Sequence, residues 1–157
     1  MASIDPDEVS RESSVLAEPV MLAAFEGWND AGEAATAALA HLHQVWEART
    51  VAELDPEDYH DFQVNRPVVT TSEHGGRTIA WPSTTISVVQ APVTGRQLVL
   101  GQGIEPSMRW RRYCTEVLDH AEGLGVRALV TLGALLADTP HTRPIPVSST
   151  TDDEDLL

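Results

Sequence analysis

The chain contains no lysine, since all ten of its basic residues are arginines. A protein without lysine has neither a Schiff-base lysine nor the lysine of a phosphate-binding P-loop. Two further signatures are missing from the sequence, the Gly-x-Ser-x-Gly nucleophile elbow and the glycine-rich dinucleotide fingerprint. These absences exclude several common classes of enzyme.

Cysteine is almost as scarce, because Cys114 is the only one. A single cysteine excludes an internal disulfide and suits a reducing compartment, so we expect a cytoplasmic protein. Cys114 falls on the apolar side of a predicted helix and is interpreted as a buried structural thiol. The six histidines are scattered, with His41 and His43 on different sides of a helix, so we expect no metal site and no cofactor.

Long apolar runs are also missing, and none approaches the length of about 18 residues that a transmembrane helix needs. Residues 1–18 are polar and acidic, the opposite of a signal peptide, and are predicted to be a disordered leader. The net charge of −14 argues against nucleic acid as the main partner. We therefore expect neither a membrane nor a nucleic acid to be bound.

An apolar run at residues 20–25 leads into a polar loop and then into an alanine-rich segment. Apolar side chains recur at helical spacing over residues 31–46, which predicts a helix thin enough to lie close on a sheet. Asp30 with Glu33 three residues later is typical of a capping box at the start of such a helix.

A second apolar run, at residues 127–132, is predicted to be a buried parallel strand, and a proline-rich loop follows it. Because the carboxyl ends of parallel strands meet at one edge, we expect the loops 26–30 and 133–143 to share the edge where open α/β sheets bind ligands. The candidate ligand- or partner-binding residues on these loops are Glu26, Trp28, Asn29, Asp30, Asp138, His141 and Arg143.

Each of these candidates has a structural alternative. Asp30 is most simply a helix cap, and Trp28 can fill a core or a subunit contact. Asp138, His141 and Arg143 resemble an acid–base–anchor set, because a carboxylate partner can tune a histidine near neutrality. An Asp-x-x-His spacing in a proline-rich loop is weak evidence for catalysis, so a structural or interface role is favoured.

A second helix is predicted to begin near Pro106 and to end around Gly123 and Gly125. Its arginines crowd the amino end, where each opposes the helix dipole at a cost of about 0.3–1 kcal/mol if exposed. Arg109 and Arg112 are therefore further weak candidates for binding a phosphate or an acidic partner. A solvated helix face is an equally good interpretation.

Between these segments the chain is predicted to be mainly β, with strands at 50–54, 85–90 and 97–100 and a hairpin formed by residues 68–73 and 77–81. Seven strand candidates then stand against two convincing helices. A mostly parallel sheet needs helices on both faces, and two helices leave much of one face bare. We expect a second half or a partner chain to complete the core.

Three stretches of the sequence resemble the PAC2 family, the proteasome assembly chaperone 2-like proteins, in its actinobacterial branch. They are FEGWNDAG at residues 25–32, GIEPS at 103–107 and LGALLADTPHTRP at 132–144. The resemblance implies a three-layer α/β fold with a mostly parallel sheet and flanking helices, similar to the nucleoside phosphorylases. Family members are about twice as long, so residues 19–157 are expected to be the amino-terminal part of a single, incomplete domain.

The resemblance also implies a function without settled catalytic activity. It favours a non-enzymatic interaction protein that forms homo-oligomers and has protein partners, proteasome subunits among them. The alternative is a phosphorylase-like small-molecule enzyme or ligand-binding protein that uses the strand-end loops. The sequence contains no recognisable set of phosphorylase catalytic residues. No catalytic residue is therefore assigned, and a non-enzymatic role is favoured.

Overall fold

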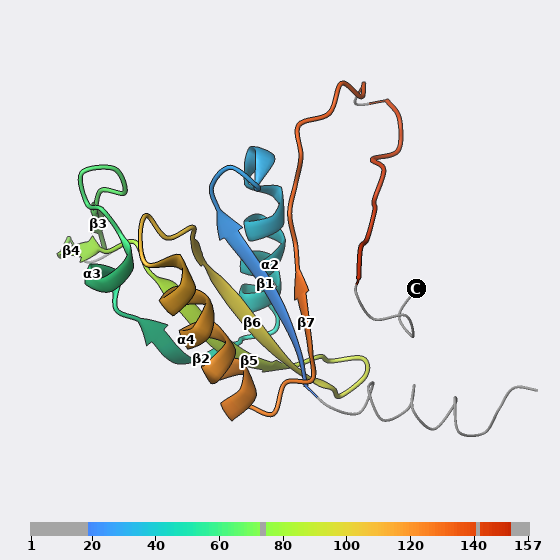
Figure 1. Cartoon of the computed structure of the whole chain (residues 1–157), viewed down its shortest axis with the longest axis horizontal. Helices are drawn as coiled ribbons and strands as arrows, with labels where there is room; N and C mark the ends of the chain where they lie inside the picture. The colour runs from blue at the N-terminus through green and yellow to red at the C-terminus, as the bar shows by residue number, and fades with distance from the viewer. Residues whose placement is uncertain (1–18, 73–74, 141, 152–157) are drawn as a thin grey trace, which may run out of the picture.

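The computed structural model describes residues 19–72, 75–140 and 142–151. Within these residues a five-stranded sheet carries the helix α2 on one face and the helix α4 on the other (Figure 1). In chain order the elements are β1 (Val20–Glu26), the 3-10 helix η1 (Ala31–Glu33), α2 (Ala34–Val45), β2 (Arg49–Leu54), α3 (Pro56–Tyr59), β3 (Val68–Thr71), β4 (Arg77–Ala80), β5 (Thr84–Gln90), β6 (Gln97–Ile104), α4 (Trp110–Gly123) and β7 (Ala128–Thr131).

The strand order of the main sheet is β2-β5-β6-β1-β7. The strands β6, β1 and β7 are parallel, whereas β5 and β2 join them as antiparallel neighbours. A short turn leads from β5 to β6 and makes that pairing antiparallel. The predicted α/β architecture, a layered sheet with helices on both faces, is confirmed.

The central strand β1 contributes to two cores, because successive side chains of a strand point to opposite faces. Met21 and Ala23 pack on the α4 side of the sheet, whereas Leu22 and Ala24 pack on the α2 side. The buried residues on the α4 side are Met21, Ala23, Leu54, Tyr59, Ile86, Val99, Tyr113, Val117 and Ala121. Those on the α2 side are Ala24, Ala35, Leu39, Val89 and Leu100.

The first helix begins later than its sequence pattern predicts. Gly32 and Glu33 lie in the left-handed region, with φ of 66° and 56°, and separate η1 from α2. Glu33 thus occupies the N-cap of α2 instead of the third helical position. The predicted capping box is wrong, because Asp30 binds amides further along the chain.

The second helix begins at Trp110 rather than at Pro106, so that prediction is also wrong. The amides of Ser107 and Met108 both donate to the carbonyl oxygen of Tyr59, at 2.9 and 3.2 Å, and are therefore taken by a contact outside the helix. The predicted end is confirmed, because Leu124 is the C-cap and Gly125 follows with φ of +75°.

The apolar arc of α4 is only partly buried. Tyr113, Val117 and Ala121, spaced four residues apart, face the sheet, whereas the side chain of Trp110 is half-exposed. Cys114 lies beside this narrow stripe and is exposed, so the prediction of a buried thiol is wrong.

The strand β7 differs in burial from the prediction at residues 127–132. It pairs in parallel with β1 as expected, but it is the outermost strand of the sheet. Its residues are exposed except for Ala128, which is half-buried. The parallel pairing is confirmed and the full burial is wrong, because no described element covers this end of the sheet.

The predicted hairpin is confirmed as a separate two-stranded ribbon in which β3 and β4 are antiparallel. His74 of its turn lies outside the described residues, as do the predicted leader at residues 1–18 and the acidic residues 152–155. Among the residues that are described, no helix is both long enough and apolar enough to cross a membrane.

Candidate functional site

The loops that follow β1 and β7 meet at the carboxyl edge of the sheet. Asp30 and Ala134 form an isolated parallel bridge. The amide of Ala31 donates to the carbonyl of Ala134 at 3.0 Å, and the amide of Ala134 donates to the carbonyl of Asn29 at 2.9 Å. The expectation that the two loops share one edge is confirmed for the parts next to the strands.

The loop after β6 reaches the same edge. The amide of Glu105 donates to the carbonyl of Glu26 at 2.9 Å. Gly27 approaches the Glu105 side chain so closely that a Cβ on Gly27 would lie 2.6 Å from Glu105 Oε2, and its φ of +150° favours glycine as well. A Cβ on Gly133 would lie 2.6 Å from Nδ2 of Asn29. The ends of three neighbouring parallel strands are therefore held together by close contacts.

Asp30 uses its carboxylate within the fold. Its side chain is buried, with 6% exposed, and accepts hydrogen bonds from the amides of Ala35 and Thr36, at 2.7 and 3.3 Å, and from the Thr36 hydroxyl. Burial raises the pKa of Asp30, but the hydrogen bonds from Thr36 and Ala35 outweigh it, so the pKa lies below its ordinary value. Asp30 thus anchors the start of α2.

Glu26 and Glu33 line an open hollow of about 630 Å³ beside Gly27, Asp30 and Gly32. Desolvation raises the pKa of Glu26, and the nearby charges of Glu33 and Asp30 raise it further. The lining contains carboxylates and no arginine, so it favours a cationic group over a phosphate. Among the described residues, no three His, Cys, Asp or Glu side chains are arranged to hold a metal ion.

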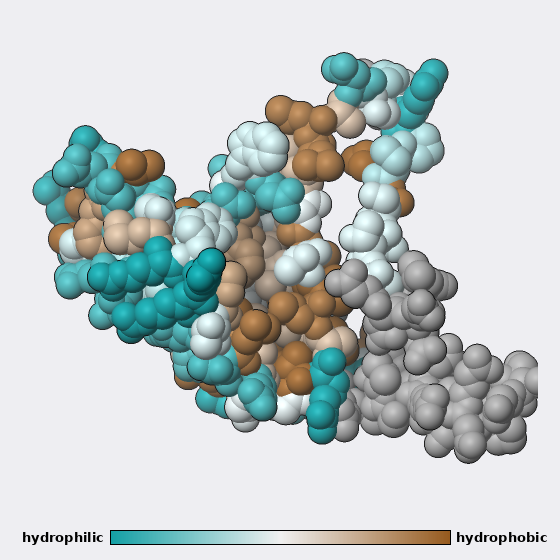
Figure 2. Space-filling view, viewed as in Figure 1, coloured by the Kyte–Doolittle hydropathy of each residue, from teal (hydrophilic) through white to brown (hydrophobic). Residues whose placement is uncertain are grey.

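Large apolar side chains surround this edge. Trp28 is 93% exposed, and Leu135 and Leu136, which follow β7, are 77% and 93% exposed. We refer to Trp28, Leu135 and Leu136 as the carboxyl-edge surface. Figure 2 shows that hydrophobic residues also gather over the sheet, between α4 and the segment that follows β7.

The other predicted site residues, Asp138, His141 and Arg143, are not assembled into a cluster by the described structure. Asp138 and Arg143 are both exposed, and the described residues contain no ion pair between them. The amide of Arg143 donates to the carbonyl of Pro140 at 3.0 Å in a local turn. His141 lies outside the described residues.

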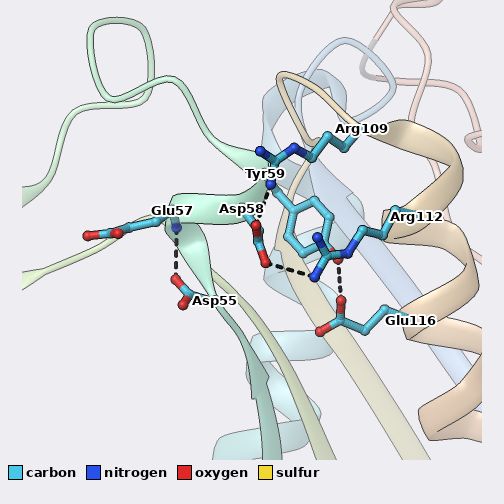
Figure 3. Close-up of polar contacts among 7 residues, drawn as sticks. All are labelled: Asp55, Glu57, Asp58, Tyr59, Arg109, Arg112 and Glu116. Atoms are coloured by element: carbon cyan, nitrogen blue, oxygen red, sulfur yellow. Dashed lines mark hydrogen bonds and ion pairs between the residues drawn. The ribbon is translucent and has the colours of Figure 1, made fainter.

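Arg109 and Arg112 lie at the start of α4 and contact α3 (Figure 3). Both guanidinium groups form ion pairs with Asp58, and the Arg112 Nη2 to Asp58 Oδ2 distance is 3.0 Å. These pairs account for the arginines at the amino end of α4 without an external anion. A charge from another element offsets the unfavourable helix dipole there.

Sequence patterns miss Tyr59, which lies at the centre of this contact. Tyr59 is 1% exposed and its hydroxyl donates to Glu116. Burial, followed by the hydrogen bond to Glu116, raises the pKa of Tyr59 to about 12. The signal that could have located α3 is the Asp55–Pro56 pair, because Asp55 caps the helix by accepting from the Glu57 amide at 3.0 Å.

Comparison with known proteins agrees with this geometry. The sequence model of the PAC2 family matches residues 24–157. A PAC2 family protein from Streptomyces avermitilis is 60% identical over 88% of this chain, with a TM-score of 0.82. A proteasome-assembly chaperone homologue from Mycobacterium tuberculosis is 52% identical over 81% of this chain, with a TM-score of 0.74. A second Mycobacterium tuberculosis protein, of unknown function, is 32% identical over 89%, with a TM-score of 0.78. No curated protein matches the chain.

The chain spans only part of these relatives, namely 59% of the Streptomyces chain and 54% and 48% of the two Mycobacterium chains. The stretches 25–32 and 103–107 begin in β1 and β6 and continue into the loops after them, and 132–144 follows β7; the parts of these loops next to the strands meet at one edge. The resemblance seen in these stretches is thus matched by the family model and by the folds of the relatives, and the chain belongs to the PAC2 family.

Proposed function

We propose that this chain is a non-enzymatic, cytoplasmic interaction protein that binds proteasome subunits and forms homo-oligomers. The proposal is supported by family membership and by the name of the Mycobacterium tuberculosis relative, a proteasome-assembly chaperone homologue 52% identical to this chain. The Streptomyces relative is named only for its family.

One observation carries the proposal, the exposure of Trp28, Leu135 and Leu136 at the carboxyl edge. Exposed apolar side chains that lie close together mark protein-binding surfaces, and tryptophan is enriched among the residues that dominate binding energy. The buried carboxylate at this edge, Asp30, is fully engaged with Ala35 and Thr36 and is not free to act on a substrate.

The phosphorylase-like alternative finds less support at the same place. A phosphorylase-like site has to hold a phosphate, and a cationic or amide-rich lining does this best. The hollow is lined by Glu26, Glu33 and Asp30 instead, and their charges repel an anion.

Binding of purified actinobacterial proteasome subunits to the full chain tests the proposal. We expect Trp28→Ala and Leu136→Ser each to weaken binding about tenfold or more, the range of a hot-spot residue. The same variants should also capture fewer proteasome subunits from native lysate than the original chain does.

The matched control is Val93→Ser, because Val93 is 97% exposed but lies in the turn that precedes β6, at the opposite end of that strand. We expect this variant to bind as the original chain does. Equal binding by all the variants, or no binding by the original chain, contradicts the proposal.

A further inference from the structure

The β3–β4 ribbon stands apart from the main sheet. Its two strands pack mainly against each other, and all of their residues are exposed. Figure 1 shows the ribbon at the side of the molecule far from β7. Val69 and Ile79, which lie directly opposite each other, are 61% and 58% exposed. A two-stranded hairpin is at best marginally stable in water, so this ribbon needs further strands or a covering element.

The hydrogen bond next to the turn determines which backbone groups of the ribbon are free. The amide of Ser72 donates to the carbonyl of Gly76 at 2.8 Å, so this pair is hydrogen-bonded. Hydrogen-bonded and non-hydrogen-bonded pairs alternate along an antiparallel ladder. The pair of Val69 and Ile79, three positions further along, is therefore non-hydrogen-bonded. The N–H and C=O groups of these two residues point to the outer edges of the ribbon.

The outer edges of β3 and β4 differ. Directly before β3, the same alternation places Pro67 at an outward position, and proline has no N–H to donate, so this edge is blunted. On β4 the outward residues are Arg77 and Ile79, and both have an N–H. Among the described residues, no hydrogen bond or ion pair engages the guanidinium group of Arg77. The β4 edge is therefore the one that can accept another strand.

We propose that the outer edge of β4 is a self-association surface, on which β4 of a second copy of this chain pairs in the antiparallel direction about a twofold axis at Ile79. The inference rests on the homo-oligomer of the proposed function and deepens it by naming the surface. The two ribbons then form one four-stranded sheet, so each copy supplies the strands that the other lacks.

The β4 segment is complementary to itself in this register. A twofold axis at Ile79 puts the residue two positions before Ile79 in one copy opposite the residue two positions after it in the other. Arg77 of each copy therefore lies opposite Trp81 of the second copy. Trp81 is 49% exposed, and a guanidinium group near an aromatic ring is favourable. On the same face, Val69 and Ile79 of the two copies form one continuous apolar row.

The local charge permits a second copy at this surface. The net charge of the chain is −14, which opposes close association of two copies through most of their surfaces. Residues 66–81 instead carry two arginines and one glutamate, so the ribbon segment is not acidic. A strand of a different protein is the competing occupant of the β4 edge, and with that occupant the purified chain would be monomeric.

Sedimentation velocity of the full 157-residue chain over a wide range of concentration measures the self-association. We expect a monomer–dimer equilibrium. Ile79→Lys should raise the dimer dissociation constant about tenfold or more, because two lysines would then lie opposite each other at a strand edge. The matched control is Val68→Lys, because Val68 is also exposed, at 61%, but lies on β3. This control should dimerise as the original chain does.

Cysteine crosslinking tests the register, in a chain whose own Cys114 is replaced by serine. In Ile79→Cys the two cysteines lie opposite each other with Cα atoms about 5.5 Å apart, which is within the range of a disulfide. In Thr78→Cys the two cysteines are diagonal to each other at about 7–8 Å, which is too far for a disulfide. Mild oxidation should give a covalent dimer from Ile79→Cys and not from Thr78→Cys.

The inference is overturned if the original chain is monomeric, if Ile79→Lys dimerises as the original chain does, or if Thr78→Cys crosslinks as readily as Ile79→Cys. A dimer that survives Ile79→Lys still supports homo-oligomers through another surface. Binding of proteasome subunits is tested separately with variants at Trp28 and Leu136, and Ile79→Lys should retain that binding.

Discussion

At the residue scale, the side chain of Asp30 is held by several hydrogen bonds. Its carboxylate receives donors from two successive residues of α2 and from a hydroxyl, so it joins the end of β1 to the start of the helix. The same residue forms the bridge to Ala134 through its backbone. A single residue thus couples the helix to the loop that follows β7.

We expect Asp30→Asn to destabilise the fold by about 1–2 kcal/mol, the usual cost of losing a helix cap. The pKa of Asp30 is lowered from 3.8, so its contribution is complete above that value and is lost as the pH falls through the lower folded-state pKa. Urea unfolding measured from pH 7 into this acid range should show a difference between variant and original that shrinks as the pH falls. The control is Asp138→Asn, a change at an exposed residue. This variant should have the same stability as the original chain at every pH in this range.

Gly103 illustrates a different residue-scale constraint. A Cβ on Gly103 would lie 2.7 Å from Cα of Thr84, a backbone atom of the neighbouring strand that cannot move aside. Gly123 in α4 has no atom within 4 Å of an added Cβ. Packing therefore requires glycine at position 103, whereas at position 123 only the helix propensity of the residue matters.

We expect Gly103→Ala to cost about 1–3 kcal/mol through overpacking between β5 and β6. In thermal unfolding, Gly123→Ala should instead leave stability unchanged or raise it by about 0.5–1 kcal/mol, because alanine is the better helix former. Equal melting temperatures for the two variants would contradict the predicted clash.

At the element scale, α3 and α4 are joined by ionic and aromatic contacts. Asp58 of α3 binds both Arg109 and Arg112, and the Tyr59 ring makes an edge-on contact with Tyr113 at 5.2 Å between centroids. The Tyr113 hydroxyl lies 2.7 Å from Thr84 Oγ1, so β5 belongs to the same contact. A helix of four residues is thereby fixed on the sheet.

We expect Asp58→Asn to lower stability by about 0.5–1.5 kcal/mol, because it weakens two partly exposed ion pairs at once. Arg109→Gln and Arg112→Gln should each cost less, and the cost of either should vanish when Asp58 is already changed. Arg111→Gln is the matched control and should have no cost, since the ion pairs of the described residues do not include Arg111. Chemical unfolding of these variants as a double-mutant cycle gives the coupling energy.

The elements that were predictable from the sequence are those that bury a regular pattern. The apolar run of β1 and the helical spacing of α2 are local signals; β1 formed where it was expected, and α2 formed within its predicted range but begins later, at Ala34. The start of α4 was not predictable, because Tyr59, far away in the chain, takes the amides of Ser107 and Met108. The short α3 has too few residues to show a period.

The candidate site divides in the same way. The shared edge was predictable from strand direction alone, and Asp30 was correctly suspected of capping, though with other partners than the pattern implied. The pairing of Arg109 and Arg112 with Asp58 was not predictable, because the three residues meet only once α3 is placed. Similarly, the exposure of Cys114 depends on how narrow a stripe of α4 the sheet covers.

At the scale of the whole molecule, one helix covers each face of the sheet, and no described element covers the end at β7. We expect the chain by itself to be marginally stable and prone to aggregate, because exposed apolar strand edges promote association. Differential scanning calorimetry should show a broad or concentration-dependent transition. A sharp, reversible transition of a soluble monomer would contradict this prediction. The longer Streptomyces relative provides the control and should unfold cooperatively.

The position of β1 in the sheet has a consequence for synthesis on the ribosome. β1 is the first described strand to emerge, yet its two neighbours come much later, since Val20 pairs with Leu98 and with Ala128. At about 5–20 residues per second, the 77 residues between Val20 and Leu98 take about 4–15 s to translate. During that interval the nascent apolar strand β1 has no strand to pair with. A chain that ends before β6 cannot form the central pairs of the sheet.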